Sequence, residues 1–207
     1  MKSALRSQGI MLILSSPSGA GKSSIARALL LKDYNTKLSV SATTRQQRPG
    51  EVDGEDYHFF SKKEFDELVA QKAFIEHATV FGNQYGTLIS EVDPYLVSGV
   101  DVIFDVDWQG AKTLRKFKQT DVVSVYILPP SLDELKHRLS KRRQDSEEII
   151  SRRMQEATDE ISHYSEYDYV VINDDFDKAL ASVRSILQSE RSRVSRLDLL
   201  KDVIESL

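Results

Sequence analysis

LILSSPSGAGKSS, residues 12–24, joins an apolar run to a glycine-rich turn and then to the start of a helical pattern. Gly21, Lys22 and Ser23 match the phosphate-loop pattern G-x-x-x-x-G-K-[ST], but Ser16 stands where that pattern has its first glycine. Because Ser16 precedes a proline, its backbone is restricted to extended conformations that any L-residue tolerates. The stretch therefore predicts a phosphate-binding loop between a strand and a helix.

The residue types of this loop suit an anionic ligand. Amides at the start of a helix point at the anion, and Gly19 and Gly21 permit the positive φ and close backbone approach that binding needs. Lys22 can reach the β and γ phosphates, and the Ser23 hydroxyl can ligate Mg²⁺. The alternative is a glycine-rich turn that binds nothing. We expect a nucleoside triphosphate to contact Ser16, Pro17, Ser18, Gly19, Ala20, Gly21, Lys22, Ser23 and Ser24.

Apolar runs recur along the chain, and a helical pattern follows each of them. Their length and composition are typical of strands buried on both faces of a parallel sheet. Alternation of strand and helix predicts a doubly wound α/β core. The runs are residues 10–15, 102–106, 122–128 and 169–172. Two helix starts are marked by capping-box pairs, Ser61 with Glu64 and Ser131 with Glu134.

Two segments interrupt this alternation. Residues 40–99 begin with the polar, turn-rich TTRQQRPGEVDGEDYHFF (43–60), and residues 136–165 are helical and basic at their start. We predict one domain over residues 1–207, with 40–99 and 136–165 as insertions and the remainder as core. Taken alone, the basic stretch KHRLSKRR (136–143) would be interpreted as a solvated helix face.

Composition narrows the classes of partner. The formal net charge is −4 and the pI about 5.6, so no basic surplus favours nucleic acid. The chain has no cysteine, which excludes disulfides and thiolate metal sites and suits a reducing, cytoplasmic setting. No apolar run approaches the roughly 20 residues that a membrane helix needs. We expect neither a nucleic-acid nor a membrane partner.

Asp105 and Asp107 lie two residues apart at the carboxyl end of the apolar run 102–106, in VIFDVDWQG (residues 102–110). Residues two apart at a strand end leave the same face, and open α/β sheets bind ligands at that edge. One carboxylate could hold Mg²⁺ through water, or accept hydrogen bonds from a second substrate. Alternatively, Asp107 only caps the helix that begins near Trp108. Burial of Asp105 without a function would be costly, which favours a functional role for it.

Several motifs occur in one order along residues 10–178: the loop, TTRQQRPGEVDGEDYHFF, FIEHATVFGNQYGT, DVDWQG and VINDD. In this the chain resembles guanylate kinase, a family of nucleoside monophosphate kinases of the P-loop class. The resemblance implies a P-loop kinase fold with a five-stranded parallel core, a GMP-binding subdomain at 40–99 and a mobile, helical lid at 136–165. It implies that ATP and GMP are converted to ADP and GDP with Mg²⁺, and that dGMP is also an acceptor. The enzyme is expected to be a monomer or homodimer.

The resemblance also implies roles for residues outside the loop. Planar guanidinium groups and phenol hydroxyls suit a phosphate, and a carboxylate suits the adjacent N1 and N2 donors of guanine. Asp105 is expected at GMP, Ser23 with Asp107 at Mg²⁺, and Asn173 at adenine. The implied GMP set is Arg45, Arg48, Tyr57 and Tyr85 for the phosphate, Glu51 to orient the arginines, and Ser41, Glu76 and Thr87 for guanine.

For catalysis, the resemblance implies an in-line transfer in which a GMP phosphate oxygen attacks the γ phosphorus of ATP. Lys22 and Arg48 hold the two nucleotides, and the lid arginines Arg142 and Arg153 close onto the transferring group. Two alternatives remain: a catalytically inactive module of the same fold that binds proteins, and a kinase for another monophosphate or a phosphorylated sugar.

Overall fold

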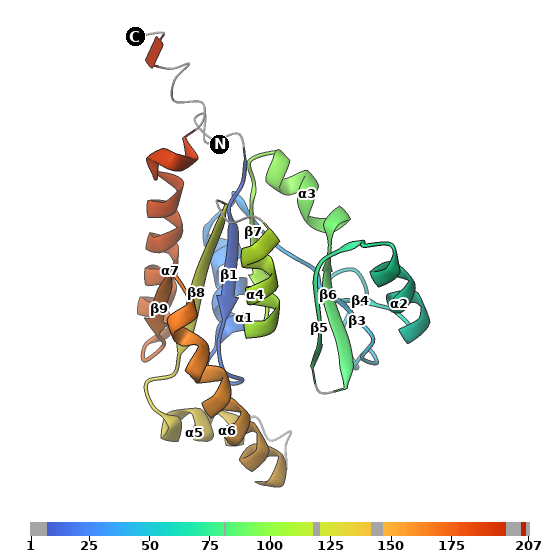
Figure 1. Ribbon diagram of the computed structural model, residues 1–207. Helices are drawn as coiled ribbons and strands as arrows, with labels where there is room; N and C mark the ends of the chain where they lie inside the picture. Colours follow the sequence, from blue (N-terminus) through green and yellow to red (C-terminus); the bar gives the residue numbers. More distant parts are fainter. Residues whose placement is uncertain (1–7, 81, 118–120, 142–146, 198–203, 206–207) are drawn as a thin grey trace.

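Two sheets of different kinds make up the framework of the protein. The computed structural model describes residues 8–80, 82–117, 121–141, 147–197 and 204–205 (Figure 1). A five-stranded sheet has the order β2-β7-β1-β8-β9, and a four-stranded sheet has the order β4-β3-β6-β5. The first carries the core, and the second lies beside it.

The five-stranded sheet is parallel throughout, as the sequence predicts. The apolar runs form β1 (Met11–Ser15), β7 (Asp101–Asp105), β8 (Val122–Leu128) and β9 (Tyr169–Ile172). The remaining strand, β2 (Thr36–Leu38), belongs to none of the predicted runs. It is a short edge strand with a polar Thr-Lys start, so it carries little of the apolar signal that marks a central strand.

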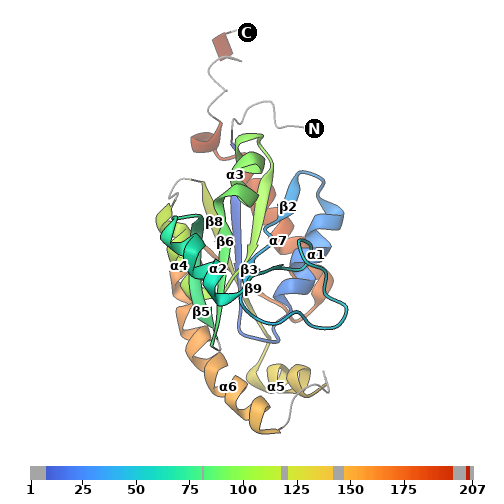
Figure 2. The same ribbon diagram turned by 90° about the vertical axis from the view of Figure 1, so that its right-hand side faces the viewer.

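Helices cover both faces of this sheet (Figure 2). Leu12 and Leu14 of β1 pack with α1 (Lys22–Lys32) and α7 (Phe176–Arg191) on one face. Met11 and Ile13 pack with α3 (Ile89–Val97) and α4 (Trp108–Phe117) on the other. Alternate residues of the central strand thus enter two separate buried clusters, as a doubly wound fold requires.

The second sheet consists of β3 (Ala42–Thr43), β4 (His58–Phe59), β5 (Phe74–Val80) and β6 (Asn83–Leu88), covered by α2 (Lys62–Ala70). The Ser61–Glu64 capping box at the start of α2 is confirmed in both its hydrogen bonds. Phe65 of α2 stacks on Phe74 of β5 with ring centroids 4.5 Å apart. Although α3 lies in the predicted 40–99 insertion, its buried Val92 and Leu96 belong to the core cluster. The limits of this subdomain stay a prediction.

The second predicted insertion corresponds to α5 (Leu132–Lys141) and α6 (Glu147–Ser162), followed by the short helix η1 (His163–Glu166). These helices share a small apolar cluster formed by Leu135, Leu139, Ile150 and Ala157. At the start of α5 the Glu134 amide donates to the Ser131 hydroxyl, but the Glu134 carboxylate pairs with Arg138. Only half of the predicted Ser131–Glu134 capping box therefore forms.

After α7 the described chain forms the short helix η2 (Val194–Arg196). Among the described residues, no helix is both long enough and apolar enough to cross a membrane.

Candidate functional site

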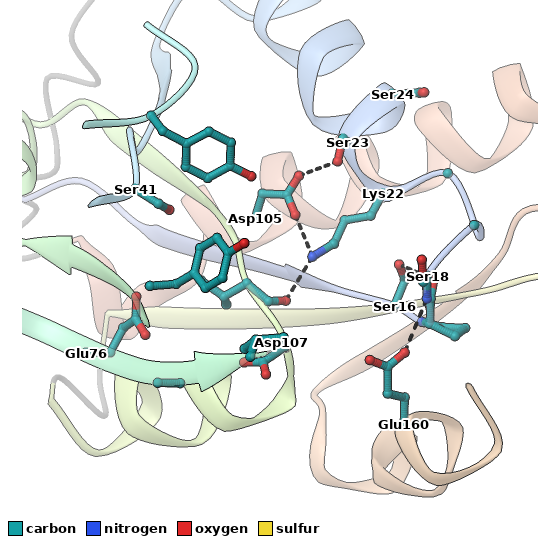
Figure 3. A pocket seen from close by; sticks show the side chains of 18 residues that line it. Ser16, Ser18, Lys22, Ser23, Ser24, Ser41, Glu76, Asp105, Asp107 and Glu160 are labelled. Carbon is teal, nitrogen blue, oxygen red and sulfur yellow. Dashed lines mark hydrogen bonds and ion pairs between the residues drawn. The ribbon is translucent and has the colours of Figure 1, made fainter. Parts of the chain in front are cut away.

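A cavity of about 370 Å³ opens at the carboxyl ends of β1 and β7, between the phosphate loop and the second sheet (Figure 3). It is at the sheet edge where the sequence predicts a ligand. Residues from both predicted sites line it together. These are Ser16, Pro17, Ser18, Gly19, Gly21, Lys22, Ser23, Ser24, Ser41, Tyr57, Glu76, Tyr85, Asp105 and Asp107.

The phosphate loop has the backbone that its sequence predicts. Gly19 and Gly21 have φ of 98° and 102°. A Cβ on Gly21 would collide with the side-chain amide of Asn173, so this position is closed to other residues. Ser16 needs no glycine-like conformation, because among the described residues Lys72 is the only non-glycine with positive φ. The conformational part of the Ser16 interpretation is therefore confirmed.

Lys22, Ser23 and Asp105 form one charged cluster where the phosphate loop enters α1 (Figure 3). The Lys22 ammonium lies 2.5 Å from one Asp105 oxygen and donates to the Val106 carbonyl at 3.1 Å. The Ser23 hydroxyl donates to the other Asp105 oxygen at 2.7 Å. Burial raises the pKa of the Asp105 carboxyl, but Lys22 and Ser23 together outweigh it and hold that pKa below its usual range. Asp105 is therefore an ionised carboxylate beside a hydroxyl.

Asp107 has a different environment. Its carboxylate accepts from the Gly110 amide at 2.9 Å and from the Gln109 side chain at 3.3 Å, so it caps the first turn of α4. The capping alternative from the sequence is thus realised, although Asp107 also lines the cavity. Within the described ranges, no group of three or more His, Asp or Glu side chains is arranged to hold a metal ion.

Glu76 lies in the second sheet, with its side chain turned toward the cavity (Figure 3). It pairs with Thr87 across β5 and β6, and the Thr87 hydroxyl donates to its carboxylate at 2.7 Å. Glu76 is only 5% exposed. Burial raises the pKa of Glu76 to about 7, although the hydrogen bond from Thr87 opposes the shift. An acid with this pKa can change its protonation state when a hydrogen-bonding ligand arrives.

The predicted phosphate-gripping residues form a network next to the cavity. The Arg45 guanidinium donates to both Glu51 oxygens at 2.8 and 3.0 Å, and Glu51 also accepts from the Arg48 amide at 2.8 Å. Arg45 lies over the Tyr57 ring, 5.2 Å from its centroid. Glu51 is therefore placed to orient the segment that carries both arginines. The side chain of Arg48 is exposed, and Arg45, Arg48 and Glu51 lie outside the cavity lining.

Neither Asn173 nor Arg153 lines the cavity. Asn173 is buried and donates from its side-chain amide to the Ala20 carbonyl at 2.7 Å, which braces the phosphate loop. Arg153 is partly buried on α6 and is absent from the cavity lining. Arg142 lies outside the described residues. Contact of these three with nucleotide stays a prediction.

The sequence interpretation missed Glu160, which α6 brings to the cavity (Figure 3). Its carboxylate accepts from the Ser18 amide in the phosphate loop at 3.2 Å. Burial raises the pKa of Glu160. Nothing in the polar helical pattern of residues 147–162 distinguishes Glu160 from neighbouring acids, because its position depends on how α6 packs against the core. Ala78 and Val80 of β5 also line the cavity without a sequence signal.

Comparison with known proteins places these features in a family. The guanylate kinase family model matches residues 8–190. A guanylate kinase from Paramagnetospirillum magneticum is 52% identical over 97% of this chain and 94% of its own length. One from Haemophilus influenzae is 57% identical over 89% and 90%. The crystal structure of guanylate kinase from Anaplasma phagocytophilum has a TM-score of 0.82 at 37% identity, covering 99% of this chain and 97% of that one.

Proposed function

The chain belongs to the guanylate kinase family, and from this membership we propose how its residues phosphorylate GMP to GDP with ATP. The observation that carries the proposal is the composition of one cavity. From the phosphate loop, Lys22, Ser23 and the backbone at Gly19 and Gly21 line this cavity. From the second sheet, the buried acid Glu76 lines it. An anion-binding loop and a group suited to guanine thus share one space.

In this proposal the loop amides and Lys22 hold the β and γ phosphates of ATP. Lys22 then exchanges part of its contact with Asp105 for phosphate oxygens, which keeps its charge compensated throughout. Catalysis consists of positioning and charge neutralisation, because the attacking phosphate oxygen is already anionic and needs no general base.

The acceptor is held from the second sheet. Glu76 accepts hydrogen bonds from the N1 and N2 groups of guanine, with Thr87 and Ser41 beside it. Arg45 and Arg48, with Tyr57 and Tyr85, hold the GMP phosphate. Arg45 is already fixed by its two-point contact with Glu51, so little of its side-chain freedom is left to lose on binding. Arg142 and Arg153 add positive charge that stabilises the negative charge on the transferring phosphoryl group.

The oxygen donors present fit Mg²⁺. The Ser23 hydroxyl and the Asp105 carboxylate are in direct contact at 2.7 Å, and Mg²⁺ prefers a few protein oxygens together with water and phosphate. We assign Ser23 to the first contact and Asp105, ahead of Asp107, to the carboxylate contact. When bound, the ion would neutralise charge on the β and γ phosphates. Asp107 is retained as the α4 cap.

The proposed contacts are to the guanine base and the phosphate of the acceptor and include none to its ribose. We therefore expect dGMP to serve as an acceptor as well. The absence of cysteine and the choice of ATP and GMP as substrates are consistent with a cytoplasmic enzyme.

Lys22→Ala tests the proposal. Turnover with ATP and GMP should fall by orders of magnitude, because the charge that steadies the β and γ phosphates is lost, while the fold persists. The control is Lys32→Ala, which removes the same charge from the exposed end of the same helix. ADP production is followed with GMP, AMP and UMP as acceptors. Wild-type turnover in Lys22→Ala, or equal turnover on AMP and GMP, would refute the assignment.

A further inference from the structure

Glu160 places a negative charge at the loop that we assign to phosphate. Its carboxylate accepts a hydrogen bond from the Ser18 amide at 3.2 Å and lines the same cavity as Lys22 and Asp107. Loop amides of this kind are the donors that hold an anion. The chain's own carboxylate therefore accepts from one of the amide donors of the phosphate loop.

The backbone of Glu160 is fixed to the core. Its carbonyl accepts from the hydroxyl of Tyr126 at 2.6 Å, and Tyr126 is a buried residue of β8 with only 1% exposure. The end of α6 is thus tied to the parallel sheet. The carboxylate can leave the loop by rotation of its own side chain, without any displacement of the helix that carries it.

The surroundings of the Glu160 carboxylate make its negative charge repel a phosphate bound in the same cavity. Lys22 is a cation whose field reaches the carboxylate, while Asp107 and Glu156 add negative charge. Lys22 is already paired with Asp105 at 2.5 Å. A triphosphate on the loop brings further negative charge to the same partly buried cavity, where repulsion is weakly screened.

We propose that Glu160 is an internal anion that competes with the triphosphate for the phosphate loop and so weakens nucleotide affinity. The inference rests on the proposed function, because it takes the loop as the ATP site. Nucleotide binding then has to displace or neutralise the Glu160 carboxylate. This residue is accordingly a determinant of ATP affinity that acts through charge.

Glu160→Gln is the direct test, because glutamine keeps the shape and can still accept from the Ser18 amide while losing the charge. Binding of Mg²⁺-tripolyphosphate and of a non-hydrolysable ATP analogue is measured by calorimetry without GMP. We expect both dissociation constants to fall by about three- to tenfold, a range typical of one partly buried charge contact. Loss of folding cannot imitate this result, since it would weaken binding.

Asp159→Asn is the matched control, because it removes the same charge from the neighbouring, exposed position of α6. Its affinity for tripolyphosphate should stay within about twofold of wild type, as expected for an exposed, screened charge. Unchanged or weaker binding in Glu160→Gln, or an equal gain in Asp159→Asn, would overturn the inference. Lys22→Ala separates the two proposals. If it binds tripolyphosphate as wild type does, the proposed function fails; if it loses binding while Glu160→Gln gains none, only the role of Glu160 fails.

Discussion

At the scale of single residues, the chemistry of the site depends on the pKa of each buried carboxyl group and on the groups that contact it. Asp105 stays ionised because Lys22 and Ser23 contact it, whereas burial raises the pKa of Glu76 to about 7. Of these two acids, Glu76 alone titrates near neutral pH. Because Glu76 is the residue that we propose to bind guanine, GMP binding should depend on pH.

We expect GMP to bind more tightly as the pH rises through about 7, because only the ionised Glu76 can accept from both guanine donors. One pH unit below this pKa, about a tenth of the carboxylate is ionised, so the affinity should be about tenfold weaker than at pH 8. The measurement is calorimetric titration of GMP from pH 6 to 8.5. Glu76→Gln supplies the baseline, since it retains only the titration of the GMP phosphate near pH 6. Parallel pH profiles in the two proteins would contradict the prediction.

The stability of the nucleotide-free protein should vary with pH in the opposite sense. The folded-state pKa of Glu76 lies above its ordinary value of 4.5, so the folded protein holds this proton more tightly than the unfolded chain. The stabilisation that results is complete below about pH 4.5 and is lost as the pH rises through about 7. Thermal unfolding of wild type and Glu76→Gln across this range should diverge accordingly.

Residue types and spacing predicted most of the loop, whereas Glu76 was expected only from the resemblance to the family. They did not reveal which of the two aspartates contacts Ser23. Alternation along a strand puts Asp105 and Asp107 on one face. However, β7 ends at Asp105, and Asp107 lies in the turn that enters α4, where its side chain rotates back to cap the helix. Contact with Ser23 consequently belongs to Asp105. Such a strand end cannot be located to one residue from an apolar pattern.

At the scale of elements, the close approach of α4 to β5 positions Glu76. Gly110 lies in the first turn of α4, and a Cβ there would be 3.0 Å from a Glu76 oxygen and 3.1 Å from the Cβ of Val106. The helix can lie this close to the second sheet because the position has no side chain. The glycine of DVDWQG is therefore tied to the geometry of the proposed guanine site.

Gly110→Ala should raise the KM for GMP by about tenfold and leave the KM for ATP unchanged, because the added methyl group displaces Glu76 and no group of the phosphate loop. Alanine favours a helix over glycine by about 1 kcal/mol, which offsets part of the crowding, so the protein should remain folded. Steady-state kinetics with each substrate varied in turn provide the measurement. Thr113→Ala, at an exposed position one turn further along α4, is the control. Wild-type KM for GMP in Gly110→Ala would show that Glu76 does not depend on this approach.

Elements with strong apolar periodicity could be predicted from sequence, and elements defined by tertiary contacts could not. The central strands of the parallel sheet match their apolar runs, whereas β2 is too short and polar to give such a signal. The capping box at Ser131 forms only in part because Arg138, one turn later, pairs with Glu134. Local patterns thus fail where a competing partner or an edge position decides the outcome.

At the scale of the whole molecule, the two edges of the parallel sheet have separate tasks. The phosphate loop and Asp105 lie at the carboxyl edge, and a buried ionic network lies at the opposite edge. There Arg191, at the end of α7, donates to both oxygens of Asp33 at 2.7 and 3.0 Å and to Asp101 at 2.6 Å. Asp101 also accepts from the Ile10 amide at 2.7 Å. The network ties the last long helix to the beginning of β1 and β7 and to the end of α1.

Arg191→Gln should therefore lower the free energy of unfolding by about 3–5 kcal/mol while kcat at moderate temperature stays near the wild-type value. Removal of the guanidinium takes the contacting cation away from the buried Asp33 and Asp101, and breaking such a buried pair is costly. Urea unfolding monitored by circular dichroism measures the loss, and Lys178→Gln, at an exposed position of the same helix, serves as the control.

The pH dependence of this loss tests its electrostatic origin. Burial raises the pKa of Asp33, but Arg191 outweighs it and holds that pKa below its ordinary value of 3.8. A lowered folded-state pKa gives stability that is present above about pH 3.8 and disappears as the pH falls through the folded value. Wild type should consequently lose more stability than Arg191→Gln on acidification below pH 4, so the difference between the two proteins should shrink. A difference that stays constant down to pH 2 would mean that Arg191 stabilises the fold through packing of its side chain, with its charge contributing little.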